Sequence, residues 1–191
     1  MRVISGKYRG LVLAEFKGSD IRPTADRVKE SLFNILAFKI AGARVLDLFC
    51  GSGSLGIECL SRGAKYAHFN DISPASIAVL NKNLTRLRGE KYAVTTGDYA
   101  ACLRGFKDKF DIAFVDPPYA DDCGVRAVEE LAARKLIYGG GVVVYERDRP
   151  FSGSVDGFDV TDERKYGKTY LTFFQPSCPC LLYTSDAADE L

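Results

Sequence analysis

The stretch V-L-D-L-F-C-G-S-G-S-L-G, residues 45–56, decides how the rest of the chain is interpreted. Apolar residues run into a glycine-rich turn and an amphipathic segment follows, so a buried parallel strand is predicted to turn into a helix here. The spacing of Gly51, Gly53 and Gly56 satisfies G-x-G-x-x-G, which lets the backbone approach a ligand closely and packs the helix tightly on the strand. Any doubly wound sheet also needs glycines at such a turn, so the pattern alone is a weak indication of a ligand site.

Two acidic residues narrow the choice of ligand. Asp71 lies 20 positions after Gly51, at the end of the next apolar run, where a carboxylate can accept both ribose hydroxyls of an adenosine. Dinucleotides and S-adenosylmethionine are therefore the candidates. Asp47, four residues before the first glycine, favours S-adenosylmethionine, because a carboxylate at the mouth of the turn repels a pyrophosphate but can face a cationic amino-acid group.

Length and composition favour a single domain with a short extension. The chain has 191 residues, of which 47% are hydrophobic and 12% aromatic, enough for one substantial core. The sequence has no run of about 18 apolar residues and no signal-peptide h-region, so neither a membrane span nor secretion is expected. We therefore expect a cytoplasmic protein.

The six cysteines and the single histidine do not suggest a metal site. The cysteines lie mostly in apolar segments without paired C-x-x-C spacing, which predicts buried free thiols rather than disulfides. His68 lies within an apolar run, so we expect it to be packed in the sheet rather than catalytic. Neither a structural zinc ion nor a catalytic metal is expected.

Charge is unevenly distributed along the chain, although the net charge is only +1. Residues 1–44 contain nine Lys or Arg and four Asp or Glu, a net of +5, whereas residues 176–191 contain three acids and no base. A basic arm beside a cofactor domain suggests a polyanionic substrate. Solvated surface charge explains the same pattern equally well.

The front of the chain predicts a small extension. Residues 2–13 are two short β-prone runs around glycines, which indicate a β-hairpin. Residues 26–37 carry apolar side chains at helical spacing, which predicts an amphipathic helix packed on the main sheet. The basic residues of this extension that we expect to contact a polyanionic substrate are Arg2, Lys7, Arg9, Arg22 and Arg27.

From residue 44 onward, predicted strands and helices alternate. The strands are 44–49, 65–70, 91–96, 110–115 and 142–145, with Gly139–Gly141 introducing the last, and the helices are 54–62, 74–88 and 123–136, with a short connecting segment at 99–105. Alternation of this kind predicts a doubly wound, mostly parallel sheet. After Pro150, the runs 158–164 and 169–174 predict a closing antiparallel hairpin.

The last stretch, S-C-P-C-L-L-Y-T-S-D-A-A-D-E-L, continues no periodicity and follows the completed hairpin. It resembles the translated adapter read-through that ends some environmental sequence assemblies. We therefore divide the chain into an N-terminal extension at 1–41, a cofactor-binding catalytic domain at 42–175 and a tail at 176–191 that we expect to be non-native.

A second motif, F-V-D-P-P-Y at 114–119, indicates the chemistry. It lies at the C-terminal end of the fourth predicted strand, the edge where ligands of such sheets bind. Asp116 can accept one hydrogen bond from an exocyclic amine and the Pro117 carbonyl can accept the second, so the amine is held while its nitrogen attacks a methyl group. Pro118 keeps the turn rigid, and Tyr119 offers a ring for base stacking.

These motifs together resemble a known family. D-P-P-Y matches the [D/N/S]-P-P-[Y/F] motif of class I S-adenosylmethionine-dependent methyltransferases that modify exocyclic amines. With R-P-T-A-D-R-V-K-E-S-L-F-N-I-L and L-D-L-F-C-G-S-G-S-L-G-I-E-C-L-S-R-G-A, the chain resembles the RsmD family of 16S rRNA guanine-N2 methyltransferases from residue 1 to about 175. It departs from that pattern at Ser5, where the family usually has glycine, and at Leu11, where a base is common.

The resemblance implies a fold, a site and a substrate. The fold would be a Rossmann-like class I methyltransferase with an N-terminal hairpin and helix and a C-terminal antiparallel hairpin. Asp47, Gly51 and Gly53 would line the methionine portion of S-adenosylmethionine, Asp71 the ribose and Asp98 the adenine amine, although from the sequence alone Asp98 is equally a helix N-cap. The partner would be small-subunit rRNA or a 30S assembly intermediate, methylated by a monomer without a metal.

Two other functions use the same motifs. An adenine-N6 DNA methyltransferase would hold its target amine with the same D-P-P-Y geometry, but the chain shows no distinct DNA target-recognition domain. A catalytically inactive RNA-binding module is the alternative outside enzymes, and the complete D-P-P-Y tetrapeptide argues against it.

Overall fold

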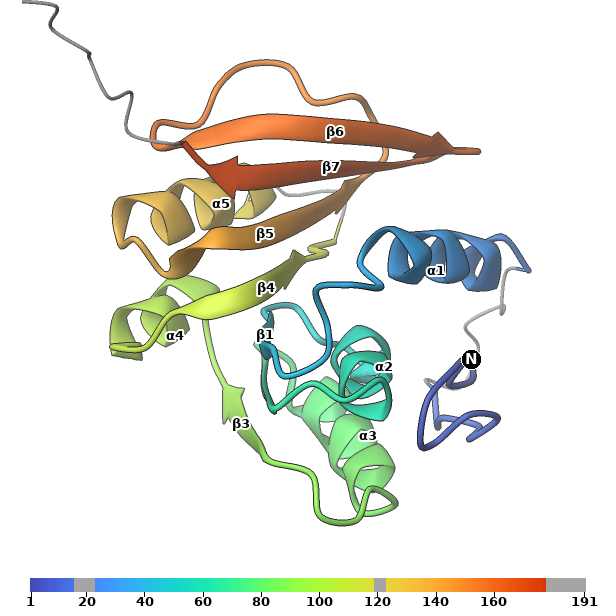
Figure 1. The fold of residues 1–191 in the computed structure, drawn as a ribbon. Coiled ribbons are helices and arrows are strands. Elements are labelled where there is room, and N and C mark those ends of the chain that lie inside the picture. Colours follow the sequence, from blue (N-terminus) through green and yellow to red (C-terminus); the bar gives the residue numbers. More distant parts are fainter. Residues whose placement is uncertain (16–22, 119–122, 178–191) are drawn as a thin grey trace, which may run out of the picture.

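The computed structural model describes residues 1–15, 23–118 and 123–177, apart from the side chains at 23–25. Helices and strands alternate from α1 to β5, and two further strands follow (Figure 1). The elements are α1 (Pro23–Ile35), β1 (Arg44–Asp47), α2 (Ser54–Ser61), β2 (Tyr66–Asp71), α3 (Pro74–Leu84), β3 (Tyr92–Thr96), α4 (Tyr99–Gly105), β4 (Phe110–Val115), α5 (Cys123–Ala133), β5 (Ile137–Arg147), β6 (Phe158–Tyr166) and β7 (Thr169–Pro176). None of the described helices is both long and apolar enough to cross a membrane.

The strands form one sheet in the order β3-β2-β1-β4-β5-β7-β6. The first five in this order run parallel to one another, and β7 pairs antiparallel with both β5 and β6. The predicted doubly wound sheet and its closing antiparallel hairpin are therefore confirmed. Chain order reverses direction between β1 and β4, so the carboxyl ends of these two strands flank the crevice where sheets of this type bind ligands.

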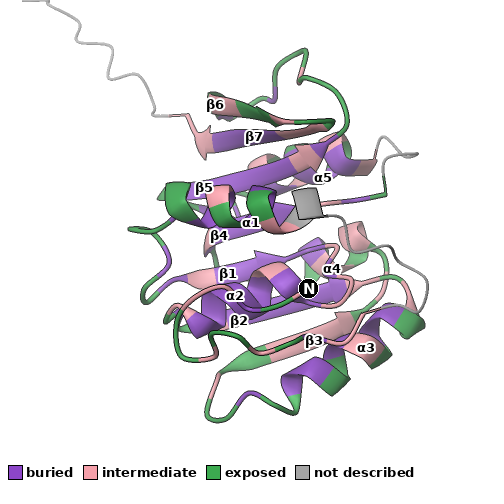
Figure 2. Cartoon of the chain, turned by 90° about the vertical axis from the view of Figure 1, so that its right-hand side faces the viewer, coloured by how far each residue is buried: buried purple, intermediate pink, exposed green. Residues whose placement is uncertain are grey.

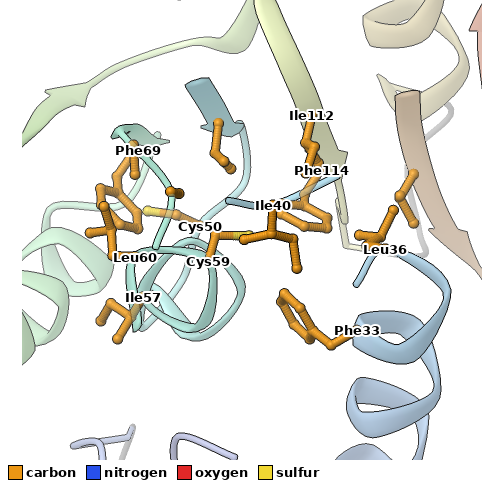
Figure 3. Packing of buried hydrophobic residues seen from close by; sticks show 14 of the residues in the cluster. Phe33, Leu36, Ile40, Cys50, Ile57, Cys59, Leu60, Phe69, Ile112 and Phe114 are labelled. Carbon is orange, nitrogen blue, oxygen red and sulfur yellow. The ribbon is translucent and has the colours of Figure 1, made fainter. Parts of the chain in front are cut away.

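Two apolar layers cover the sheet. Side chains from α1, α2 and α3 pack on one face, and those from α4 and α5 pack on the other. Figure 2 shows the buried strands behind α1 and α2. On the first face, the ring of Phe33 in α1 packs at a tilt against that of Phe114 in β4, with 6.1 Å between the ring centroids, and both side chains are buried (Figure 3). The helix of the predicted extension thus shares the hydrophobic core of the sheet.

The histidine and two of the cysteines behave as the sequence predicts, whereas Cys102 and Cys123 are free but only partly buried. Cys50 and Cys59 are free thiols among apolar side chains (Figure 3), and burial raises the pKa of both. His68 is buried in β2 and shares hydrogen bonds with Tyr66 and Thr95, while burial, aided by Arg44, lowers its pKa to about 4. A neutral histidine held in the sheet has a packing role. Cys178 and Cys180 lie outside the described residues.

Several predicted boundaries are wrong for local reasons. The segment 99–105 forms a helix, α4, because the Asp98 side chain caps its N-terminus. β5 begins at Ile137 and contains Gly139–Gly141, which were expected to precede it. A Cβ on Gly141 would lie 2.8 Å from the carbonyl oxygen of Asp111, so glycine lets β5 approach β4 closely at the shift in their register.

The predicted N-terminal hairpin is present in short form: Arg2 and Val12 form an antiparallel bridge, and the amides of Val3 and Leu13 donate to the carbonyls of Leu11 and Met1. Its backbone also bonds to α2. The amides of Ile4 and Ser5 donate to the Glu58 carboxylate at 2.8 and 3.0 Å. Gly6, with φ +84°, lies so close to the end of α2 that a Cβ there would collide with backbone.

The predicted tail begins where the sheet ends. β7 runs to Pro176, and residues 178–191 lie outside the described part of the chain. That this stretch is non-native stays a prediction.

Candidate functional site

The glycine-rich turn lies between the end of β1 and the start of α2. Gly51 has φ +52°, and a Cβ built on it would meet no atom within 4 Å, so this side of the turn is open. The Gly51 amide donates to Asp71 Oδ2 at 2.9 Å, and the other oxygen of Asp71 accepts from the Ser73 amide at 2.8 Å. The structure therefore brings the predicted turn and the predicted ribose-binding carboxylate together.

The other glycines of the motif face protein. Gly53 has φ +82°, and a Cβ there would lie 2.3 Å from Leu80. A Cβ on Gly56 would lie 2.3 Å from the ring of Phe69. Packing thus explains the absence of a side chain at both positions, and the contact of Gly53 with the methionine portion of the cofactor stays a prediction.

Asp47 is a buried carboxylate at the end of β1. Only 2% of its surface is exposed, and its Oδ2 accepts the Gly56 amide at 2.9 Å. Its pKa rises to about 7, mainly because the carboxyl group is buried. The hydrogen bond from Gly56 opposes this rise, the charge of Asp71 adds to it, and the charge of Lys29 opposes it. Asp47 and Asp71 together make this edge a place where a cation is favoured.

Asp98 has the helix-capping role that the sequence left open. Its Oδ1 accepts from the amides of Ala100 and Ala101 at 3.0 and 3.2 Å. A contact with adenine is compatible with this geometry and stays a prediction.

Sequence reasoning missed Ile72, which directly follows Asp71 and is 70% exposed. An exposed apolar side chain beside the carboxylate that is predicted to bind the ribose is one on which an adenine ring could lie.

The Asp116-Pro117-Pro118 segment follows β4 directly. Pro117 is buried and Asp116 is partly exposed. Burial raises the pKa of Asp116 well above its usual range, and the charges of Glu146 and Asp47 add to the effect. The two predicted motifs therefore meet at one sheet edge, because β1 and β4 are paired neighbours. Tyr119, the last residue of the motif, lies outside the described residues.

A shallow cleft adjoins this motif on the side of β5. Pro117 and Pro118 line one wall, and the end of β5 with the residues after it lines the other. Among the latter, Arg147 is 8% exposed, and its guanidinium lies 5.3 Å from the ring centroid of Tyr145 and 5.6 Å from that of Phe151. No sequence motif marks these β5 residues.

The basic residues predicted to contact RNA are divided between the two ends of α2. Lys7 lies near the end remote from the glycine-rich turn: its amide bonds to Ser61, and its ammonium bonds to Glu90 at 2.7 Å. Arg9 follows Lys7 in the same exposed loop. The structure does not bring these two to the Asp116 edge.

Arg27 lies in α1, whose N-terminal half faces the carboxyl edge of the sheet. Lys29 in this half is close enough to Asp47 to affect its pKa, whereas Phe33, one turn later, packs against Arg62 at the far end of α2. Arg27 is exposed, as is Arg2. Arg22 lies outside the described residues.

A buried ion cluster near the site has no counterpart in the sequence analysis. Glu58 in α2 is fully buried and lies 3.1 Å from the ammonium of Lys29 and 2.8 Å from Nε of Arg62. Burial alone would raise the pKa of Glu58, but Lys29, the Ile4 amide and Arg62 outweigh it and hold the pKa below its usual value. A charged residue in an otherwise apolar helix, followed by an arginine four residues later, was the available signal.

No group of three or more His, Cys, Asp or Glu side chains in the described ranges is arranged to hold a metal ion. The expectation of metal-free chemistry is not tested by this observation.

The sheet order, the turn after β1 and the Asp116-Pro117-Pro118 segment after β4 define a Rossmann-like class I methyltransferase. Residues 1–175 match the family described as Conserved hypothetical protein 95. The chain belongs to this family, which is the RsmD family that its sequence resembles.

Individual relatives agree with this assignment. The YlbH protein of Bacillus subtilis is 35% identical over 181 residues, which cover 92% of this chain and 98% of that protein. Ribosomal RNA small subunit methyltransferase D of Haemophilus influenzae is 35% identical over 156 residues, covering 78% of this chain and 81% of that one. The solved structure of the yhhF protein from Escherichia coli is similar with a TM-score of 0.82 and 30% identity, covering 92% of this chain and 97% of that chain.

Proposed function

We propose that the protein transfers a methyl group from S-adenosylmethionine to the exocyclic N2 amine of a guanine in small-subunit rRNA. The observation that carries the proposal is the position of Asp116 and Pro117 at the carboxyl end of β4, beside the open turn at Gly51. The curated relatives named ribosomal RNA small subunit methyltransferase D support the choice of substrate.

The residues at this edge fit the cofactor. S-adenosylmethionine, when bound, supplies a methyl group already activated on a cationic sulfur. Asp47 and Asp71 offer carboxylates to its positive charges and ribose hydroxyls, and the raised pKa of Asp47 is the expected property of a buried acid that lacks a full positive partner. Gly51 leaves open space where the ligand would approach the backbone.

Asp116 and Pro117 would act on the base. The Asp116 carboxylate accepts one N–H of the amine and the Pro117 carbonyl accepts the other, which directs the nitrogen lone pair at the methyl carbon. A nitrogen–carbon bond then forms as the sulfur–carbon bond breaks, and the amine loses one proton. A carboxyl group with a raised pKa is a good acceptor for that proton. Most of the acceleration is expected from positioning in a line with the leaving sulfur.

The base must leave its stack to reach this edge. Guanine stacked in RNA hides N2 from a buried donor, so the target is unpaired or extruded at a cost of a few kcal/mol. Tyr119 would recover part of this by stacking, worth about 1–3 kcal/mol per base. The N-terminal extension would hold flanking phosphates of the 16S rRNA or of a 30S assembly intermediate, and we expect the enzyme to act as a monomer in the cytoplasm.

The test is transfer of tritium from labelled S-adenosylmethionine to undermethylated small subunits, to their naked rRNA and to duplex DNA. We expect label in small-subunit RNA, recovered as N2-methylguanine on digestion. Asp116→Asn keeps the shape but removes the carboxylate, so turnover should fall at least about 100-fold while calorimetry shows cofactor binding within about threefold of wild type. Label confined to adenine in DNA would replace the proposal with the adenine-N6 alternative, and no label in any nucleic acid would favour the inactive module.

A further inference from the structure

One side chain joins the glycine-rich turn to the end of the N-terminal segment. Asn83 of α3 is fully buried. Its Oδ1 accepts from the Ala14 amide at 2.7 Å, and its Nδ2 donates to the Ala14 carbonyl at 3.1 Å and to the Ser52 carbonyl at 2.9 Å. Backbone groups 69 and 31 positions away from Asn83 in the sequence therefore meet at one side-chain amide.

The three backbone groups require a carboxamide between them. An amide side chain has one oxygen that accepts and one NH2 that donates twice, which matches one backbone amide and two carbonyls. An aspartate of the same size would turn an oxygen toward both carbonyls, and an alanine would offer nothing to any of the three groups. Because the side chain is buried, a lost bond leaves its partner without a replacement from solvent.

The bond to Ser52 completes the support of the glycine-rich turn. The Gly51 amide donates to the predicted ribose-binding carboxylate, and the Gly53 amide donates to the Cys50 carbonyl at 2.7 Å. The Ser52 carbonyl belongs to the same peptide unit as the Gly53 amide, so Asn83 holds the other side of that unit. The open position of the turn, Gly51, thus lies between backbone groups that are fixed before and after it.

We propose that Asn83 is a positioning residue for S-adenosylmethionine. Through the Ser52 carbonyl it holds the turn in the conformation that binds the cofactor, and through Ala14 it ties that conformation to the N-terminal segment. A turn that is already in its binding conformation binds more tightly, because no part of the binding free energy is spent on ordering it. The inference rests on the proposed function and deepens it, because it adds to the cofactor site a residue that belongs to neither motif.

A positioning role and a packing role differ in what a substitution changes. If Asn83 only joined segments of the fold, its replacement would lower the unfolding free energy and leave the cofactor affinity of the folded protein as it is. If Asn83 sets the turn, the affinity falls in protein that is still folded. Titration calorimetry with S-adenosylmethionine, on protein that a urea titration shows to be folded, separates the two roles.

Asn83→Asp keeps the size of the side chain and removes its two donors. We expect the Kd for S-adenosylmethionine to rise about 10- to 100-fold at pH 8. With small-subunit RNA as the substrate, KM for S-adenosylmethionine should rise with Kd, while kcat stays within about threefold of the wild type because the reacting groups at Asp116 and Pro117 are unaltered. Asn81→Asp is the matched control: it adds the same charge at an exposed position of the same helix and should leave Kd unchanged.

The pH dependence of the aspartate variant tests the cause of the loss. A buried carboxyl group that faces two carbonyl oxygens has a raised pKa, and once protonated it can again donate one hydrogen bond. The Kd of Asn83→Asp divided by the wild-type Kd should therefore fall at least about threefold between pH 8 and pH 5.5. Taking this ratio cancels the titration of Asp47, which both proteins share. Asn83→Ala should raise Kd without such a pH dependence, and it serves if the aspartate variant does not fold.

Two results would overturn the positioning role. One is a wild-type Kd in folded Asn83→Asp and Asn83→Ala together with a lowered unfolding free energy, which would assign Asn83 to packing alone. The other is a ratio of Kd values for Asn83→Asp that stays the same from pH 8 to pH 5.5, because the lost donor is then not the cause. Neither result depends on the base that is methylated. A wild-type protein that binds S-adenosylmethionine but labels no guanine would end the proposed function and leave the role of Asn83 in place.

Discussion

Replacing Asp47 with asparagine should stabilise the protein at neutral and alkaline pH. Burial is the main cause that raises the pKa of Asp47 from 3.8 to about 7. The asparagine carbonyl can still accept the Gly56 amide, which lies 2.9 Å from Oδ2 in the native protein. The substitution therefore removes the ionisation and keeps the hydrogen bond.

The sign and size follow from linkage. In the unfolded chain the carboxyl group ionises near 3.8, so between that pH and 7 the folded protein retains a proton that the unfolded chain has released. Stability contributed by Asp47 is therefore lost as pH rises through this interval. Compared with a group that never ionises, Asp47 lowers the unfolding free energy by about 1.6 kcal/mol at pH 5 and by close to about 4 kcal/mol at pH 8.

Urea unfolding of the wild type and Asp47→Asn at pH 5, 6 and 8 measures this difference. The unfolding free energy of the variant should exceed that of the wild type by an amount that grows with pH and reaches about 4 kcal/mol. Calorimetry should show weaker binding of S-adenosylmethionine to the variant. Asp156→Asn, at an exposed turn, controls for the loss of one negative charge. A difference in unfolding free energy between Asp47→Asn and wild type that is the same at pH 5 and pH 8 would refute the reasoning, because a buried acid with a raised pKa cannot give it.

Three further perturbations test other parts of the structure. Glu58→Gln leaves Lys29 and Arg62 without their shared carboxylate. It should lower the unfolding free energy measured in urea at pH 7 by about 3–5 kcal/mol. A loss below about 1 kcal/mol would mean that the cluster is solvated. If the Asp116 carboxylate is the required form, kcat/KM should rise with pH, because burial raises its pKa, and a flat profile from pH 6 to 9 would contradict this. In filter binding of small-subunit RNA at several salt concentrations, Arg27→Ala should reduce the salt slope by about one, and Lys7→Ala by less, since Lys7 is paired with Glu90.

Much of the fold follows from local pattern. β4 was predicted with its observed ends because an apolar run meets Asp116 and a proline that cannot continue a central strand. The meeting of the Gly51 turn with Asp71 was also predictable, since parallel strands with helical crossovers bring their carboxyl ends to one edge. These features depend on residues close together in sequence.

The rest depends on partners distant in sequence. Glu58 is 54 residues from Ile4, and nothing near either position indicates that they meet. The glycines at 139–141 look like a turn, but their place within β5 depends on the close approach of Asp111 from β4. Arg147 resembles any arginine at a strand end until the rings on either side of it are known.

The acidic groups at the carboxyl edge link stability to function. Burial and the charge of Asp71 raise the pKa of Asp47, and Lys29 opposes this rise. Burial and the charges of Glu146 and Asp47 raise the pKa of Asp116. A fold selected for stability alone would place amides or apolar groups here. A cation bound at this edge stabilises each ionised carboxylate, so the groups that weaken the unliganded fold are those that favour a positively charged cofactor. We expect binding of such a cofactor to favour the ionised form of Asp116, which is the form that could accept a hydrogen bond from the amine.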